Sequence, residues 1–228
     1  MHEEKLLLDI FINPHQVPHY VSYAFLASVI LIVVGLIVRS SLKLIPTGIQ
    51  NFMEAITDGI HNLVEENIGH HWTPTLFPLI ATIALYIAVC NFMGLIPGLY
   101  SPTSNVNNNA AMAIPVFLAT HVFGVRAHGI GYFKHFLGPV RSIFALPLMI
   151  LMFIIEGIGH LVRPVTLTVR LFGNMAAKHI ILLVLGGLAP WIIPTAILAL
   201  GTLVSIIQAF VFTLLTTLYL AGAVEEAH

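Results

Sequence analysis

The sequence has little charge. Only 8% of its 228 residues are Asp, Glu, Lys or Arg, whereas 58% are hydrophobic. Soluble globular domains carry roughly 25% charged residues. The composition therefore excludes an ordinary soluble domain and predicts a polytopic membrane protein. The formal net charge is -1, so no nucleic acid is expected as a partner.

The sequence also has few cysteines, no recognisable signal peptide and no repeat. A single cysteine, Cys90, excludes an internal disulfide. The N-terminal stretch lacks a basic region before an apolar core, so it does not resemble a cleaved signal peptide. No internal repeat or linker divides the chain. We therefore expect a single membrane domain over residues 1–228.

Long apolar runs predict about five transmembrane helices. The fourth run is about 47 residues, or roughly 70 Å as a helix, whereas a bilayer core is ~30 Å thick. It is either two spans with an exposed basic loop at 163–178, or one long tilted helix that forms a hairpin with the last segment. Apolar residues throughout 163–178 favour the hairpin. The predicted spans are 21–38, 76–96, 110–125, 143–189 and 195–221, with a polar loop at 101–109.

Residues 47–72 have a different pattern. Apolar residues recur at helical spacing, and Gln50, Glu54, Asp58 and Glu65 occupy the opposite face. This pattern is typical of an amphipathic helix at the membrane interface. A solvated linking helix with one face on its own protein fits the pattern equally well.

Basic residues predict the orientation. Arg39 and Lys43 follow the first span, and Arg126, Lys134 and Arg141 follow the third, but the loop after the second span has no Lys or Arg. Cytoplasmic loops are enriched in Lys and Arg. We therefore expect the N-terminus outside and the C-terminus in the cytoplasm.

Polar side chains recur on one face of the fourth segment. With about 100° of rotation per residue, five of them fall within about 40° of Glu156. Pro164 interrupts this run and is expected to kink the helix. Each ionisable group in hydrocarbon costs at least ~2.5–3.5 kcal/mol, so the stripe should face protein or water. Its members are His160, Arg163, Arg170, Asn174 and Lys178.

Arg170 has no evident partner on its own helix. In a purely structural interpretation, Glu156 and Arg163 neutralise each other and Lys178 extends to the interface. That interpretation leaves Arg170 unexplained, because arginine keeps its proton in proteins. Glu156 is the nearest carboxylate on the helix, and it lies 14 residues or roughly 21 Å away. A partner subunit that supplies an acid is one solution.

Several motifs carry a family resemblance. EGIGHLVRPVTLTVRLFGNM and the later SIIQAFVFTLLTTLYL resemble subunit a of the bacterial F-type ATP synthase. NFMGLIPG, PTSNVNNNAAMAI and HGIGYFKHFLGPV have counterparts in that family in the same order. The resemblance covers residues 76–228, and the first span and the amphipathic helix also fit it.

The resemblance implies the proton-conducting stator subunit of the F0 motor, in one copy per complex. Its partners would be the ring of c subunits, the subunit b stalk, the rest of the F1F0 complex and membrane lipid. The subunit would lie in a prokaryotic inner membrane, would catalyse no reaction itself, and would need no cofactor or metal. The coupling ion stays open, with the proton as the default and sodium as the alternative.

The resemblance also implies roles for individual residues. Arg170 matches the family's essential arginine, which faces the ring carboxylates, and Asn174 and Gln208 match the amides beside it. Thr202, Ser205 and Gln208 recur every three residues and would form a polar edge. The residues implied to line two offset half-channels are Glu156, His179, Lys178, Thr166, Asn105 and Ser205.

Three positions depart from the family pattern. His179 stands where relatives often have glutamate, Gly201 stands where they often have His or Glu, and Asn105 stands where they often have Asp. The half-channel on the uptake side, with Lys178 and His179, is therefore altered. His179 is the best relay candidate there, because histidine titrates near ~6.5.

Two other function classes share features with this sequence. The 12 histidines raise the possibility of haem or metal, but no two lie on one apolar segment at ligand spacing. A stand-alone ion-coupled secondary transporter would also keep charges at mid-membrane. Such transporters commonly contain inverted repeats and paired broken helices, and neither is evident in this sequence.

Overall fold

The chain is helical over most of the part that the computed structural model describes, which is residues 17–40, 42–96, 98–132, 146–186 and 192–225. Five helices there are long and apolar enough to cross a membrane. The predicted fold class, an all-α membrane protein, is therefore confirmed. The helices, with two short 3-10 turns, are α1 (His19–Ser40), α2 (Ile49–Ile68), α3 (Thr73–Met93), η2 (Pro102–Ser104), α4 (Val106–His128), η3 (Gly129–Gly131), α6 (Leu146–Gly186) and α7 (Ile192–Val224).

Two helices begin earlier than the hydropathy pattern indicated. α3 begins at Thr73 because Pro74 is tolerated in a first turn, where its missing N–H needs no partner. α4 begins at Val106, although a loop was expected up to residue 109. Asn105 caps it, and its side-chain oxygen accepts a hydrogen bond from the Asn107 backbone N–H at 2.9 Å. The polar asparagines after Asn105 are thus the first turn of a helix.

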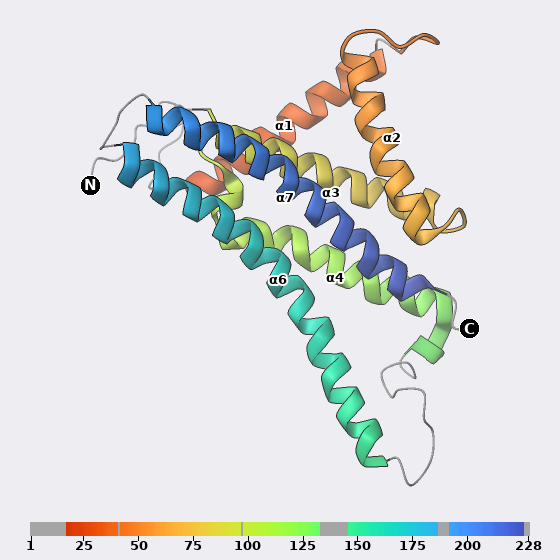
Figure 1. Ribbon diagram of the computed structural model, residues 1–228. Coiled ribbons are helices and arrows are strands. Elements are labelled where there is room, and N and C mark those ends of the chain that lie inside the picture. Colours follow the sequence, from red (N-terminus) through yellow and green to blue (C-terminus); the bar gives the residue numbers. More distant parts are fainter. Residues whose placement is uncertain (1–16, 41, 97, 133–145, 187–191, 226–228) are drawn as a thin grey trace.

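The long fourth segment is one helix. α6 runs without interruption for 41 residues and contains Pro164. The basic residues between 163 and 178 are therefore helical and do not form a loop. Figure 1 shows α6 changing direction part-way along its length, with α7 beside its second half as the other arm of a hairpin. The ends of the expected range, 143–145 and 187–189, lie outside the described residues.

α2 packs one face against its own protein. Val64 of α2 is fully buried and forms a cluster with Leu76 of α3 and Leu220 of α7. Ile49 and Phe52, in the first turn of α2, remain 62% and 64% exposed. The covered face fits the second of the two sequence interpretations, in which the helix rests on its own chain.

The main core lies where α3, α4, α6 and α7 meet. Leu167 and Leu171 point into it from α6, and Phe212 points into it from α7. These three side chains are at most 1% exposed. They fix which face of α6 is turned inward. The core consists of Ile83, Ile87, Met112, Ala113, Val116, Leu167, Leu171 and Phe212.

A buried polar network ties the connection between α3 and α4 to the bundle. Ser101 Oγ donates to the carbonyl of Cys90 at 2.9 Å, and Thr103 Oγ1 donates to Asn91 Oδ1 at 2.8 Å. Asn109 Nδ2 donates to the Thr103 carbonyl at 2.8 Å. Buried polar groups are costly unless they are hydrogen-bonded. These bonds therefore set the conformation of the loop.

We expect Gly94→Ala to disrupt this network. A Cβ at Gly94 would lie 2.6 Å from Ser101 Cβ, and Ser101 is held by its own hydrogen bonds. Overpacking of this kind typically costs about 1–3 kcal/mol, so the thermal midpoint of the detergent-solubilised protein should fall. Gly35→Ala in α1 is the matched control, because nothing lies within 4 Å of the added atom. Equal midpoints for the two variants would contradict the expectation.

Candidate functional site around Arg170

The packing of α6 turns Arg170 outward. Leu167, Leu171 and Met175 are buried against the bundle, whereas Arg170 and Asn174 are exposed. The stripe seen in the sequence is therefore divided in the structure, since part of it faces away from this chain. The physical reason is that the apolar side chains of α6 determine which side packs on the bundle.

Arg170 has no counter-ion within the described part of the chain. The ion pairs formed there involve Glu65, on α2, and Glu156, on α6, and neither reaches Arg170. Arginine keeps its charge in proteins. An exposed guanidinium on the side of an apolar helix therefore requires an anion or water from outside the described part of this chain.

Asn174 and Gln208 join the two arms of the hairpin beside Arg170. Asn174 Nδ2 donates to Gln208 Oε1 at 2.7 Å. Gln208 is only 3% exposed, whereas Asn174 lies on the exposed face. This contact brings together two amides that are 34 positions apart in the sequence. It also fixes the rotation of α7 relative to α6 at the level of Arg170.

Ser205 lies one turn before Gln208 on α7 and is fully buried. Its hydroxyl donates to the Gly201 carbonyl at 2.7 Å, and its own carbonyl accepts from Asn91 Nδ2 at 3.4 Å. Thr202 is half-buried, and its hydroxyl donates to the Leu198 carbonyl at 2.9 Å. Ser205 and Gln208 therefore share a buried face, while Thr202 lies at its margin.

Lys178 points into the bundle. It is 8% exposed, and Nζ donates to the Gly94 carbonyl at 3.0 Å. The purely structural interpretation, in which Lys178 extends to the membrane interface, is therefore wrong for this residue. Its stem lies against Gly201, where a Cβ would come within 3.0 Å of Lys178 Cδ. The glycine at 201 therefore makes room for the lysine. The next residue, His179, is half-buried.

Glu156 lies near a different partner from the one in the purely structural interpretation. Its Oε1 is 3.4 Å from His160 Nε2, one turn along α6. Arg163 instead places its guanidinium 5.0 Å from the centroid of the Tyr219 ring on α7. Among the described residues, Glu156 and Arg163 thus do not neutralise each other.

Two predicted half-channel residues bond to nearby backbone. Thr166 is exposed, and its hydroxyl donates to the Arg163 carbonyl at 2.9 Å. The side chain of Asn105 is the cap of α4. Neither observation assigns a transport role to these residues.

Sequence reasoning missed a group of aromatic and imidazole side chains around Glu156. His121 of α4 lies beside His160, with 5.3 Å between ring centroids. Tyr132 follows η3, and its hydroxyl is 3.3 Å from His121 Nδ1. Burial raises the pKa of Tyr132, with Arg163 opposing the shift and Glu156 adding to it. The only signal in the sequence was that His121 and His160 both lie in apolar runs.

Comparisons with known proteins identify the family of this chain. A sequence model of the ATP synthase A chain family matches residues 21–221. ATP synthase subunit a 3 of Pelobacter propionicus is 51% identical over 91% of this chain and 88% of its own length. ATP synthase subunit a of Trichlorobacter lovleyi is 52% identical, and that of Geobacter sulfurreducens 49%, over the same shares of each chain. The chain belongs to the ATP synthase A chain family.

Proposed function

We propose that this chain is the proton-conducting stator subunit of the F0 motor of an ATP synthase. One observation carries the proposal. Arg170 is a permanent cation on an exposed face of a membrane helix, and the described part of its own chain offers no counter-ion. Membership of the ATP synthase A chain family favours this function over a stand-alone secondary transporter.

The partner at this face is proposed to be a ring of c subunits, each with one carboxylate at mid-membrane. Gly173 has nothing within 4 Å of a Cβ position and lies between Arg170 and Asn174 on the exposed side. Small residues let another helix approach closely in a membrane. On α7, Ile207 next to Gln208 is a further exposed apolar side chain.

Arg170 would act by lowering the proton affinity of a carboxyl group. An opposite charge within a few ångströms lowers a carboxylate pKa by about 1–3 units. A protonated ring carboxyl that leaves the lipid and meets Arg170 would release its proton toward one side. The guanidinium would also block direct leakage between two offset half-channels. The membrane potential supplies ~2.3 kcal/mol per charge per 100 mV.

The half-channels are proposed to lie at opposite ends of α6. Glu156 would line the one that reaches the cytoplasm, and Lys178 and His179 would line the one on the uptake side. Thr166, Asn105 and Ser205 stay candidate lining residues. The Asn174–Gln208 bond would hold the amide of Gln208 near the ring carboxylate.

The remaining assignments follow from the same proposal. The subunit would contribute no catalytic centre for ATP, would occur once per complex, and would contact the subunit b stalk. It would lie in the inner membrane with its N-terminus outside. The ends of α4 and α7 line one cleft with Arg126 and Val224, which supports a cytoplasmic C-terminus under the positive-inside rule.

Arg170→Ala should abolish ATP-driven proton pumping by the assembled complex, because nothing else on the face would discharge the ring carboxylates. The measurement is acidification of inverted vesicles upon ATP addition. Arg39→Ala, at the exposed end of α1, is the matched control and should pump normally. Retained pumping by Arg170→Ala, with normal subunit assembly, would rule out the proposed function.

Gln208→Leu and Asn174→Leu should slow pumping to a similar degree. Each removes the same 2.7 Å hydrogen bond, and one such bond is worth about 0.5–1.5 kcal/mol, or about a two- to tenfold change. The double variant should be little slower than either single one, because coupled residues are not additive. Fully additive effects would show that the two amides act independently.

Gly173→Leu should block the approach of the ring and leave this chain intact. The new side chain would meet nothing in its own subunit, since no atom lies within 4 Å of the added Cβ. We therefore expect a normal thermal midpoint of the isolated subunit and loss of its co-purification with the ring. Full retention of the ring would mean that this face does not contact it.

A further inference from the structure

A polar cluster lies between α4 and the first half of α6, around Glu156. It consists of His160 on α6, His121 on α4 and Tyr132 after η3. His160 is 8% exposed and Tyr132 is 4% exposed. Imidazoles enclosed among membrane helices require a reason, because apolar side chains would pack there at lower cost.

The cluster is built around the imidazole of His160. One ring nitrogen, Nε2, lies 3.4 Å from Glu156 Oε1, and the other, Nδ1, is also buried. The His121 ring packs edge-on against it, with an interplanar angle of 61°. Nδ1 thus faces into the bundle, while Nε2 faces the partly exposed carboxylate of Glu156.

His121 is held in place from several directions. The Tyr132 hydroxyl and Thr120 Oγ1 lie 3.3 Å and 3.4 Å from His121 Nδ1. Gly124 leaves room for the Tyr132 ring, since a Cβ there would come within 2.4 Å of Cε2. The absence of a side chain at Gly124 thus lets Tyr132 reach His121, and this contact fixes the position of the imidazole.

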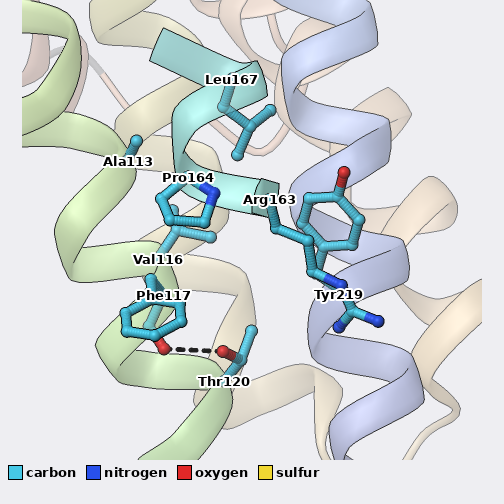
Figure 2. A pocket seen from close by; sticks show the side chains of 8 residues that line it. All are labelled: Ala113, Val116, Phe117, Thr120, Arg163, Pro164, Leu167 and Tyr219. Atoms are coloured by element: carbon cyan, nitrogen blue, oxygen red, sulfur yellow. Dashed lines mark hydrogen bonds between the residues drawn. The ribbon is translucent and has the colours of Figure 1, made fainter. Parts of the chain in front are cut away.

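A small cavity lies between α4, α6 and α7, beside Arg163. Its volume is about 10 Å³, near the lower limit for one water molecule. Figure 2 shows the Arg163 side chain reaching to Tyr219 on one side of it, while Thr120 bonds the Phe117 carbonyl on the other. The residues that line the cavity are Ala113, Val116, Phe117, Thr120, Arg163, Pro164, Leu167 and Tyr219.

Glu156, His160 and Arg170 follow one another along α6 in the order that a proton path would need. His160 is ten positions before Arg170, or roughly 15 Å along the helix axis. Glu156 is one turn further, or roughly 6 Å. The cavity adjoins the turns between His160 and Arg170, because Arg163, Pro164 and Leu167 line it. The imidazole therefore stands between the ring-facing arginine and the half-channel carboxylate.

We propose that His160 is a proton-relay residue between the Arg170 face and Glu156, and that His121 is its positioning residue. The inference rests on the proposed function and deepens it. A proton released near Arg170 arrives through water at His160 Nδ1. The proton on Nε2 leaves to Glu156 Oε1 and then to bulk water, and a turn of the ring restores the starting tautomer.

Titratable and charged groups near His160 influence its charge. Among the described residues, Glu156 and Arg163 come from its own helix and His121 comes from α4. Tyr132 lies behind His121, and Tyr219 of α7 holds the Arg163 guanidinium. A merely structural His160 would satisfy the same contacts without exchanging its proton during turnover.

Chemical rescue distinguishes these roles. The test measures ATP-driven formation of membrane potential in inverted vesicles that contain the whole complex, with the pH gradient collapsed by a potassium–proton exchanger. His160→Ala should slow the initial rate by about tenfold or more, as for loss of a proton-transfer group. Added imidazole should restore the rate in a saturable manner, and pyrazole, a much weaker base of the same shape, should not.

The chain offers a matched control pair. His61 lies 3.5 Å from Glu65 on α2, with the same spacing of four residues as Glu156 and His160. His61→Ala should pump at the wild-type rate with or without imidazole. His121→Phe keeps an aromatic ring beside His160, and it should slow pumping less than His160→Ala and change its pH profile.

His160→Gln provides a second variant that keeps a polar side chain but cannot carry a proton. Its rate should lose the dependence on pH that the wild type shows across the histidine range. A normal rate and pH profile in this variant, or slow pumping by His160→Ala that imidazole does not restore, would overturn the relay. Normal pumping by Arg170→Ala would instead overturn the proposed function, so the two failures are distinguishable.

Discussion

The structure depends on the cost of an unpaired ion in hydrocarbon. Arg170 cannot lose its proton, and burial of its charge would cost several kcal/mol or more. α6 meets this constraint by packing Leu167 and Leu171 into the core and leaving Arg170 on the outer face. The same packing joins Asn174 to Gln208, so the hairpin presents a cation beside a pair of hydrogen-bonded amides.

The bundle behind this face is held by polar as well as apolar contacts. Thr103, in the connection between α3 and α4, donates to Asn91 near the end of α3, and Asn91 donates to the Ser205 carbonyl on α7. Lys178 donates to the Gly94 carbonyl at the end of α3. Because these polar groups are largely buried from water, each hydrogen bond avoids the cost of leaving a polar group unsatisfied. The site on α6 and α7 is thus supported by the turn between α3 and α4, which carries no charge.

Much of the fold could be predicted from local patterns. Charge-free runs identified four of the five spans, because ions are costly in hydrocarbon whatever the tertiary arrangement. Helix starts were less accurate, as at α4, where the cap at Asn105 outweighs the polarity of the following asparagines. The stripe on α6 was recognised from its spacing, but spacing alone placed Arg170 and Lys178 on one inward face. The structure puts Lys178 inside and Arg170 outside.

The sequence by itself determined that this is an all-α membrane protein with a permanent cation in its fourth membrane segment, because those properties depend on composition and helical periodicity. Only the tertiary structure decided which helix face is covered, that Gly201 accommodates Lys178, and that His121 adjoins His160. Such contacts join residues far apart in the chain. They depend on how α4, α6 and α7 cross, and that geometry is set by the whole core and not by any one segment.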